Sequence, residues 1–269
     1  MIPTRLPAVA GAFYPADRVA LQHEVNGYLQ HAKVPPAVFA TAASLKALVV
    51  PHAGYVYSGP IAATGYRLLQ AIKDRVRRVV LLGPAHRVWV PGLALPGVGV
   101  FSTPLGDVPL DMTAMAEIAK LPQVEVNAST HAMEHSLEVQ LPFLQTVLED
   151  FTLVPLVVGT ASAETVAEVL DRLWGGPETV IIVSSDLSHF LDYAHAQQSD
   201  MATAESILHF DIGLVGEAAC GAHPLNGLLL SARRRFLKAS LLDLRNSGDT
   251  CGDKSRVVGY GAFAFMEVM

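Results

Sequence analysis

Short apolar runs alternate along the chain with longer segments whose apolar residues recur at helical spacing. Residues 47–50, 76–82 and 180–183 are mostly apolar and have the length of strands. Such runs are typical of strands that are covered on both faces of a sheet. Because helical patterns separate them, the sequence predicts an α/β fold, a three-layer domain with a largely parallel or mixed sheet.

The remaining pattern extends this alternation to the C-terminus. Further strands are predicted at 124–126, 151–158 and 257–265, and helices at 17–33, 60–72, 111–120, 137–148, 163–173, 194–210 and 225–238. Pro60 suits the first turn of its helix, and Pro142 should kink its helix or limit where that helix begins. Residues 88–109 are rich in Gly, Pro and Val and predict irregular or hairpin structure. With no repeat and no linker, residues 1–269 are expected to form a single domain.

Length, hydropathy, charge and cysteine content limit the classes of protein to which this chain could belong. The chain has 269 residues, a mean hydropathy of +0.36 and a net charge of −6. No apolar run approaches the ~20 residues that cross a bilayer, so we expect no membrane span. The acidic balance argues against a nucleic-acid partner. No signal peptide is recognisable, and two cysteines are too few for a disulfide scaffold, so we expect free thiols and a cytoplasmic protein.

Histidines follow predicted strands at three places. His52, His86 and His189 each lie within six residues of the end of an apolar run. The carboxyl ends of parallel strands share one edge of a sheet, so these imidazoles can converge. Converging neutral imidazoles are good ligands for a transition metal, and imidazole also carries protons near neutral pH.

Residues 131–135, HAMEH, match H-x-x-E-H, a zinc-peptidase pattern. On one helix, His131 and His135 would share a face and Glu134 could activate water. The match is short, and it precedes the clear apolar helix near Leu137. A zinc peptidase is therefore one alternative. In the other, His135 reaches the edge of the histidine site and acts there as a catalytic group.

Several other polar residues are candidates for the same site. Cys251 lies in a polar turn before the last strand, where a loop thiolate can ligate a metal, and Asp249 or Asp253 could do so instead. Asp186 could orient a histidine. Cys220 flanks a helix start and is expected to be structural. Phosphate-binding loops, G-x-S-x-G elbows and strand-following G-x-G-x-x-G motifs do not occur, which removes support for nucleotide-dependent and serine-hydrolase chemistry.

A set of motifs, in this order, resembles the Memo family, whose prokaryotic members are also called AmmeMemoRadiSam system protein B. The motifs are AGAFYP (10–15), PHAGYVYSG (51–59), GPAH (83–86), EHSLEVQLP (134–142), SSDLSH (184–189), Cys220-Gly221 with Pro224, and GDKSRVVGY (252–260). The resemblance extends from about residue 5 to 265.

The resemblance implies a fold and a ligand set. It implies a fold similar to class III extradiol ring-cleavage dioxygenases, in which two histidines and a carboxylate hold non-haem iron. His52 and His86 match the two histidine ligands, and His189, with Asp186 beside it, matches the acid/base histidine. Cys251 lies near the place where animal members supply a cysteine ligand. A thiolate in place of the carboxylate changes the preference among iron, copper and zinc.

Together these features predict a metal-binding protein. More specifically, they predict an iron- or copper-dependent redox enzyme with an extradiol-dioxygenase-like site. The alternative is a non-catalytic binding or scaffold protein that uses the same cleft. The resemblance implies a small-molecule or peptide ligand in the cleft, and AMMECR1-type and radical SAM proteins as partners.

Overall fold

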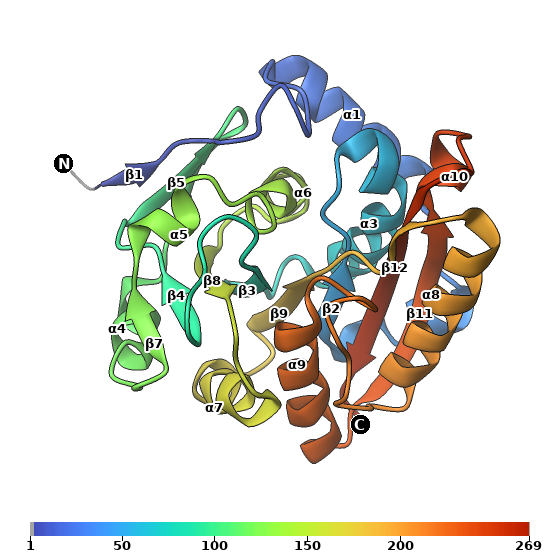
Figure 1. Ribbon diagram of the computed structural model, residues 1–269. Coiled ribbons are helices and arrows are strands. Elements are labelled where there is room, and N and C mark those ends of the chain that lie inside the picture. The colour runs from blue at the N-terminus through green and yellow to red at the C-terminus, as the bar shows by residue number, and fades with distance from the viewer. Residues whose placement is uncertain (1–2, 269) are drawn as a thin grey trace.

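The computed structural model describes residues 3–268 and is built around a mixed sheet (Figure 1). This nine-stranded sheet has the order β10-β12-β2-β9-β3-β8-β4-β7, and β11 pairs with β12. Its strands are β2 (Leu45–Val50), β3 (Arg78–Pro84), β4 (Leu93–Leu95), β7 (Val124–Val126), β8 (Thr152–Val158), β9 (Thr179–Ser184), β10 (His189–Leu191), β11 (Lys238–Asn246) and β12 (Val257–Met266). A separate three-stranded sheet contains β1 (Thr4–Arg5), β5 (Val100–Thr103) and β6 (Gly106–Pro109).

The centre of the large sheet is parallel. Strand β9 lies between β2 and β3 and runs parallel to both, and β3 runs parallel to β8. Antiparallel pairs occur toward the two sides, where β12 joins β2 and β4 joins β8. The predicted α/β class with a parallel or mixed sheet is therefore confirmed, and the hairpin expected within 88–109 is the antiparallel pair β5–β6.

Helices flank the sheet on both sides. The α-helices are α1 (Arg18–His31), α2 (Pro36–Phe39), α3 (Tyr55–Leu69), α4 (Met112–Ile118), α5 (Ala128–Ala132), α6 (Leu141–Val147), α7 (Ala163–Leu173), α8 (Tyr193–Leu208), α9 (Ala222–Arg234) and α10 (Ser247–Thr250). Short 3-10 helices are η1 (Ala42–Ser44), η2 (Gln70–Ile72) and η3 (Glu138–Gln140). In Figure 1 the strands cross the middle of the view, with α3 and α6 above them and α7 and α9 below.

Burial of the central strands explains their composition. Every residue of β2 and of β9 is buried, which requires cover on both faces of the sheet. Helix α3 packs against β2 and β12, while α9 packs against β3, β9 and α7. The buried apolar residues of these layers form one continuous core.

Side-chain caps fix the starts of several helices. Asp17 accepts a hydrogen bond from the Ala20 amide at 2.9 Å and so caps the N-terminus of α1. Asp111 caps α4 in the same way through the Ala114 amide. These local contacts explain why both helices begin where the sequence pattern predicts.

Helix α3 begins earlier than predicted, which places Pro60 inside it. Tyr55 anchors the earlier start, because its amide donates to the Phe13 carbonyl at 2.8 Å and its hydroxyl donates to the Val139 carbonyl at 2.6 Å. Pro60 has no N–H to donate to the Val56 carbonyl four residues before it. The predicted helix 137–148 is likewise divided, into η3 and α6, before Pro142.

No helix within residues 3–268 is long and apolar enough to cross a membrane.

Candidate metal centre

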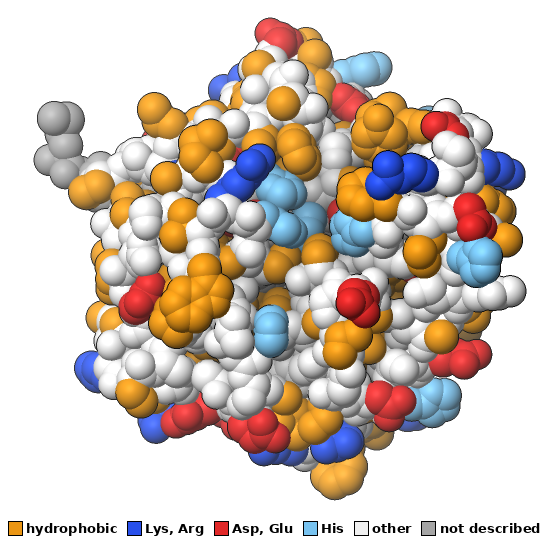
Figure 2. Space-filling view, viewed as in Figure 1, with side chains coloured by type: hydrophobic (Ala, Val, Ile, Leu, Met, Phe, Trp, Pro, Cys, Tyr) orange, Lys and Arg blue, Asp and Glu red, His pale blue; other side chains and the backbone are white. Residues whose placement is uncertain are grey.

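Three neighbouring parallel strands end at the same edge of the sheet. Val50 at the end of β2 lies in register with Ser184 at the end of β9, and β3 ends on the other side of β9 at Pro84. His52 and His86 each follow their strand by two residues. Figure 2 shows histidine side chains gathered in a hollow near the centre of this face of the molecule.

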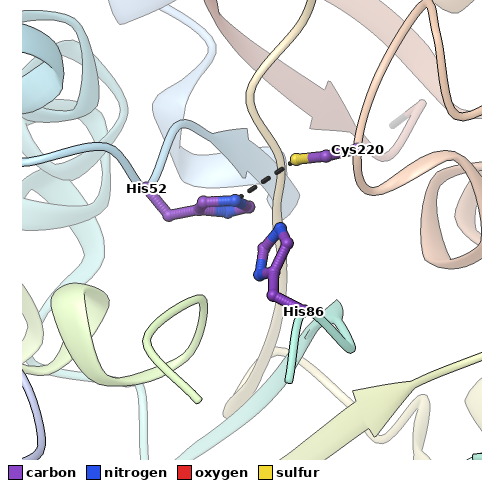
Figure 3. A group of neighbouring side chains, drawn as sticks. All are labelled: His52, His86 and Cys220. Atoms are coloured by element: carbon purple, nitrogen blue, oxygen red, sulfur yellow. Dashed lines mark hydrogen bonds between the residues drawn. The ribbon is translucent and has the colours of Figure 1, made fainter. Parts of the chain in front are cut away.

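The imidazoles of His52 and His86 meet over the end of β9. Their ring centroids are 5.1 Å apart, with an interplanar angle of 74°. The Cys220 thiol joins them, with its Sγ 3.2 Å from His52 Nε2 (Figure 3). One donor atom from each of the three side chains lies within 4.8 Å of the others. This arrangement brings together the two predicted histidine ligands and a thiol for which the sequence predicts only a structural role.

Cys220 is held in place by the segment that precedes α9. Its Sγ accepts a hydrogen bond from the Asp186 amide at 3.3 Å, and the next residue, Gly221, donates its amide to Ser185 Oγ at 2.9 Å. Burial raises the pKa of the Cys220 thiol to about 12. The thiol is therefore protonated at neutral pH, and a metal would have to displace its proton to bind the sulfur.

Glu134 orients His86. Glu134 Oε1 lies 2.9 Å from His86 Nδ1, and Oε2 accepts the His86 amide at 2.6 Å. Oε1 also accepts the amides of His135 and Ser136, both at 2.9 Å. Burial raises the pKa of Glu134, but the hydrogen bonds from His86 and the backbone outweigh it and hold the pKa at about 2. The carboxylate is thus ionised and accepts four hydrogen bonds.

A second group of potential ligands consists of His86, Glu134 and His135. Glu134 already accepts four hydrogen bonds, three of them at Oε1, so only Oε2 has a lone pair left for a metal. The His135 ring instead stacks on His86 at 4.6 Å and packs against Phe13 at 4.7 Å. Burial and the neighbouring His86 lower the pKa of His135 to about 4. His135 is therefore a neutral imidazole beside the first group.

Asp186 contacts the backbone of the His52 turn. Its Oδ1 accepts the His52 amide at 2.7 Å, and burial raises its pKa to about 7. From the sequence, we expect this carboxylate to orient a histidine side chain. In the structure it positions the His52 main chain instead.

His189 lies on β10 at the wall of a cleft of about 750 Å³. The cleft is lined by His86, His189, Leu191, Ser199, Val215, Gly216, Glu217, Ala218 and Cys220. Burial lowers the pKa of His189, so its imidazole is neutral at pH 7. His189 thus shares a cleft with two members of the candidate metal group without belonging to that group.

Cys251 belongs to neither group of potential metal ligands in residues 3–268. It directly follows α10, whose start is stabilised by a capping box formed by Asn246 and Asp249. Its exposed Sγ lies 3.8 Å from the Val56 carbonyl, the carbonyl to which Pro60, lacking an N–H, cannot donate.

Asp249 and Asp253, the alternative carboxylate ligands, also lie outside both groups. Asp249 accepts the Tyr193 hydroxyl at 2.6 Å, and Asp253 accepts the Ser255 amide at 2.9 Å. The structure brings Cys220, and none of these three turn residues, to the two histidines.

The H-x-x-E-H segment does not lie on one helix face. Helix α5 ends at Ala132, before Glu134 and His135. His131 is buried, and its Nε2 lies 2.8 Å from the Ala94 carbonyl. The geometry that a zinc peptidase would need from this motif is absent.

The donor set of the first group suits a borderline transition metal. Two imidazole nitrogens and one thiolate are ligands that zinc, copper and iron sites share. Burial lowers the pKa of His52 well below its usual value, so the ring is neutral and one of its two nitrogens has a lone pair for coordination. The residues therefore fit a metal ion of this class.

Comparison with known proteins agrees with the motifs. A family profile described as Memo-like protein matches residues 5–264. The chain belongs to the Memo family. Among curated Memo relatives, a MEMO1 family protein of Ignicoccus hospitalis is 38% identical, and the alignment covers 97% of this chain and 98% of that protein. Others from Sulfolobus acidocaldarius and Nitrosopumilus maritimus are 35% and 33% identical, each covering 97% of this chain and 99% of the relative.

Among solved structures, the fold of this Memo chain is shared by the following protein. It is the uncharacterized protein JW3007 from Escherichia coli K12, with a TM-score of 0.53 and 12% sequence identity. The match covers 81% of this chain and 99% of that one. This likeness supports the α/β fold.

Proposed function

We propose that this Memo-family chain binds a transition metal through His52, His86 and a cysteine thiolate, and uses it in redox chemistry. The observation that carries the proposal is the convergence of two strand-end imidazoles and the Cys220 thiol within 4.8 Å. Iron or copper is the expected metal, and zinc would also fit the donors. A bound iron or copper ion would supply one-electron chemistry, which none of the surrounding side chains provides.

The surrounding residues would position the ligands and move protons. Glu134 holds the His86 ring, and Asp186 holds the main chain of His52. His189 lines the cleft and is a neutral imidazole, so it could accept a proton from a molecule bound there. His135, also neutral, stacks on His86 and is not among the residues that line the cleft. A small molecule with an ionisable hydroxyl, as in an extradiol-dioxygenase-like reaction, is the substrate class that we propose.

Metal titration of purified, metal-free protein tests the ligand assignment. The wild type should bind one equivalent of Fe²⁺ or Cu²⁺, and His52→Ala and His86→Ala should each lose stoichiometric binding. His23→Ala, which changes an exposed histidine of α1, is the matched control and should bind like the wild type. Unchanged stoichiometric binding in both site variants would contradict the assignment.

Oxygen consumption tests the redox proposal separately from metal binding. Metal-loaded protein is supplied with a panel of catechols and related aromatics, and oxygen uptake is followed for the wild type and His189→Ala. Uptake that depends on His189 supports an enzyme. Binding of these aromatics without uptake favours the alternative, a binding protein that uses the same cleft.

A further inference from the structure

We propose that Ser184 is a positioning residue that selects the tautomer of His52, so that the Nε2 lone pair of this imidazole faces the candidate metal site. The part of this inference that concerns metal affinity rests on the proposed function. The tautomer itself is a property of the metal-free protein.

The Ser184 hydroxyl is completely buried and has three polar neighbours. Its Oγ is 2.6 Å from the Ser136 carbonyl, 2.7 Å from Gln140 Nε2 and 2.9 Å from His52 Nδ1. A hydroxyl has one proton to donate and two lone pairs that accept. The Ser136 carbonyl oxygen can only accept, so the Ser184 proton is donated there.

The Gln140 amide is fixed in orientation by its other contacts. Its Nε2 is 2.9 Å from the Pro51 carbonyl, which can only accept a hydrogen bond. Its Oε1 accepts the buried Tyr66 hydroxyl at 2.8 Å. Gln140 therefore donates its second N–H to Ser184 Oγ.

His52 completes the arrangement around the hydroxyl. Because Ser184 has already donated its proton, its remaining lone pair is satisfied only if His52 Nδ1 carries a hydrogen and donates it. Nε2 of the same ring is then unprotonated. It lies 3.2 Å from Cys220 Sγ, in the candidate metal group (Figure 3).

His86 is held in the same tautomer by a different hydrogen-bond partner. The Glu134 carboxylate oxygen beside it accepts, so His86 Nδ1 also carries a hydrogen, and Nε2 is the nitrogen that would coordinate a metal. A hydroxyl network and a carboxylate thus prepare the two imidazoles in the same tautomer. Groups that fix a ligating histidine in this way typically contribute about 10–100-fold to metal affinity.

Without the Ser184 hydroxyl, His52 should lose its preference for the tautomer with the hydrogen on Nδ1. In Ser184→Ala, Nδ1 has no acceptor, whereas a hydrogen on Nε2 could be donated to the Cys220 sulfur. The wrong tautomer would then be favoured, and metal binding would first require the hydrogen to move. We expect metal affinity to fall about 10–100-fold.

Nitrogen-15 NMR of the histidine rings in metal-free protein at pH 7 measures the tautomers directly. His52 and His86 should both carry the hydrogen on Nδ1 in the wild type, and His52 alone should shift toward Nε2–H in Ser184→Ala. Ser231→Ala is the matched control, because Ser231 is also completely buried and its hydroxyl has no hydrogen-bond partner within residues 3–268. It should leave both tautomers unchanged.

An Nε2–H tautomer of His52 in the wild type would overturn the inference, even if Ser184→Ala failed to fold. An unchanged His52 tautomer in a folded Ser184→Ala protein would overturn it as well. Fe²⁺ or Cu²⁺ titration of the same samples is a separate readout. If the wild type binds neither ion, the proposed function fails while the NMR result still decides the role of Ser184.

Discussion

Glu134 is the residue on which the geometry of His86 depends most directly. It accepts both the ring and the amide of His86, and it closes its own turn by accepting the amides of His135 and Ser136. Glutamine has the same shape, but its NH₂ group would face one or more of these N–H donors. The charge and both oxygens of Glu134 are therefore needed together.

We expect Glu134→Gln to weaken metal binding about 10–100-fold. The substitution loses the ionised acceptor that fixes the His86 ring, while the ligand atoms themselves remain. Isothermal titration with Cu²⁺ measures the effect. Glu217→Gln changes an exposed carboxylate that lines the same cleft, and it should bind the metal like the wild type. Equal affinities in the two variants would contradict the role of Glu134.

His131 should make the fold sensitive to acid. Burial lowers its pKa from 6.5 to about 4, so the unfolded chain binds a proton more readily than the folded chain in this interval. Stability should therefore fall as pH decreases from about 6.5 to about 4, by about 3 kcal/mol for this residue at about 1.36 kcal/mol per pKa unit.

Urea unfolding across this pH range measures the contribution of His131. Gln can present an N–H toward the Ala94 carbonyl but does not titrate, so the His131→Gln curve should be flatter than the wild-type curve. Other buried histidines contribute equally to both proteins. Parallel curves would show that His131 is not the source of the acid sensitivity.

At the scale of elements, the site depends on how closely α9 approaches the end of β9. A Cβ at Gly221 would lie 2.7 Å from Ser185 Cβ and 3.0 Å from the Ser184 carbonyl oxygen. These neighbours belong to the strand end, so a side chain at Gly221 would have to push apart the segments that bring Cys220 to His52.

Gly221→Ala should therefore destabilise the protein by about 1–3 kcal/mol and weaken metal binding at the same time. Gly216→Ala, in the same loop, is the control, because a Cβ there would lie more than 4 Å from every described residue other than its chain neighbours. Thermal unfolding and metal titration of both variants test this. A Gly221→Ala protein that matches Gly216→Ala in both measurements would argue against a close-packed approach of α9.

At the scale of the whole molecule, a buried ion pair joins the N-terminal segment to the segment that carries Glu134. Arg5 Nη1 lies 2.8 Å from Glu138 Oε2, and both side chains are almost completely buried. Arg5 also donates to the carbonyls of His131 and Glu134, at 2.6 and 2.7 Å. Glu138 further accepts the Tyr14 hydroxyl at 2.6 Å.

We expect Glu138→Gln to cost about 3–5 kcal/mol in the free energy of unfolding, because it leaves the Arg5 charge buried without its counter-ion. The exposed pair of Lys73 and Glu149 provides the comparison, and Glu149→Gln should cost less than about 1 kcal/mol. Urea denaturation measures both. Similar small losses in the two variants would mean that the Arg5–Glu138 pair does not hold the N-terminal segment in place.

Sequence patterns predict the parts of this molecule that depend on local order. The apolar runs give the central strands, and the position of His52 and His86 just after β2 and β3 predicts their convergence, because parallel strands end at one edge. The early start of α3 is not predicted, since it depends on the contacts of Tyr55 with the distant residues Phe13 and Val139.

Residues that reach the site through long-range packing are missed by sequence patterns or assigned another role. Cys220 lies in a loop far along the chain, and its only signal is its place in a motif of the Memo resemblance. Cys251 has the same chemistry, but the capped helix α10 leaves it at the surface beside the Val56 carbonyl. Ser184 carries no signal of its own, since its role depends on three partners from separate segments.

We propose that His52, His86 and Cys220 together hold the metal. X-ray absorption at the edge of the bound metal tests it most directly, in the wild type, Cys220→Ser and Cys251→Ser loaded with one equivalent of Zn²⁺. We predict nitrogen neighbours at about 2.0–2.1 Å and one sulfur at about 2.3 Å in the wild type and Cys251→Ser, and no sulfur in Cys220→Ser. A sulfur that persists in Cys220→Ser and disappears in Cys251→Ser would contradict the assignment.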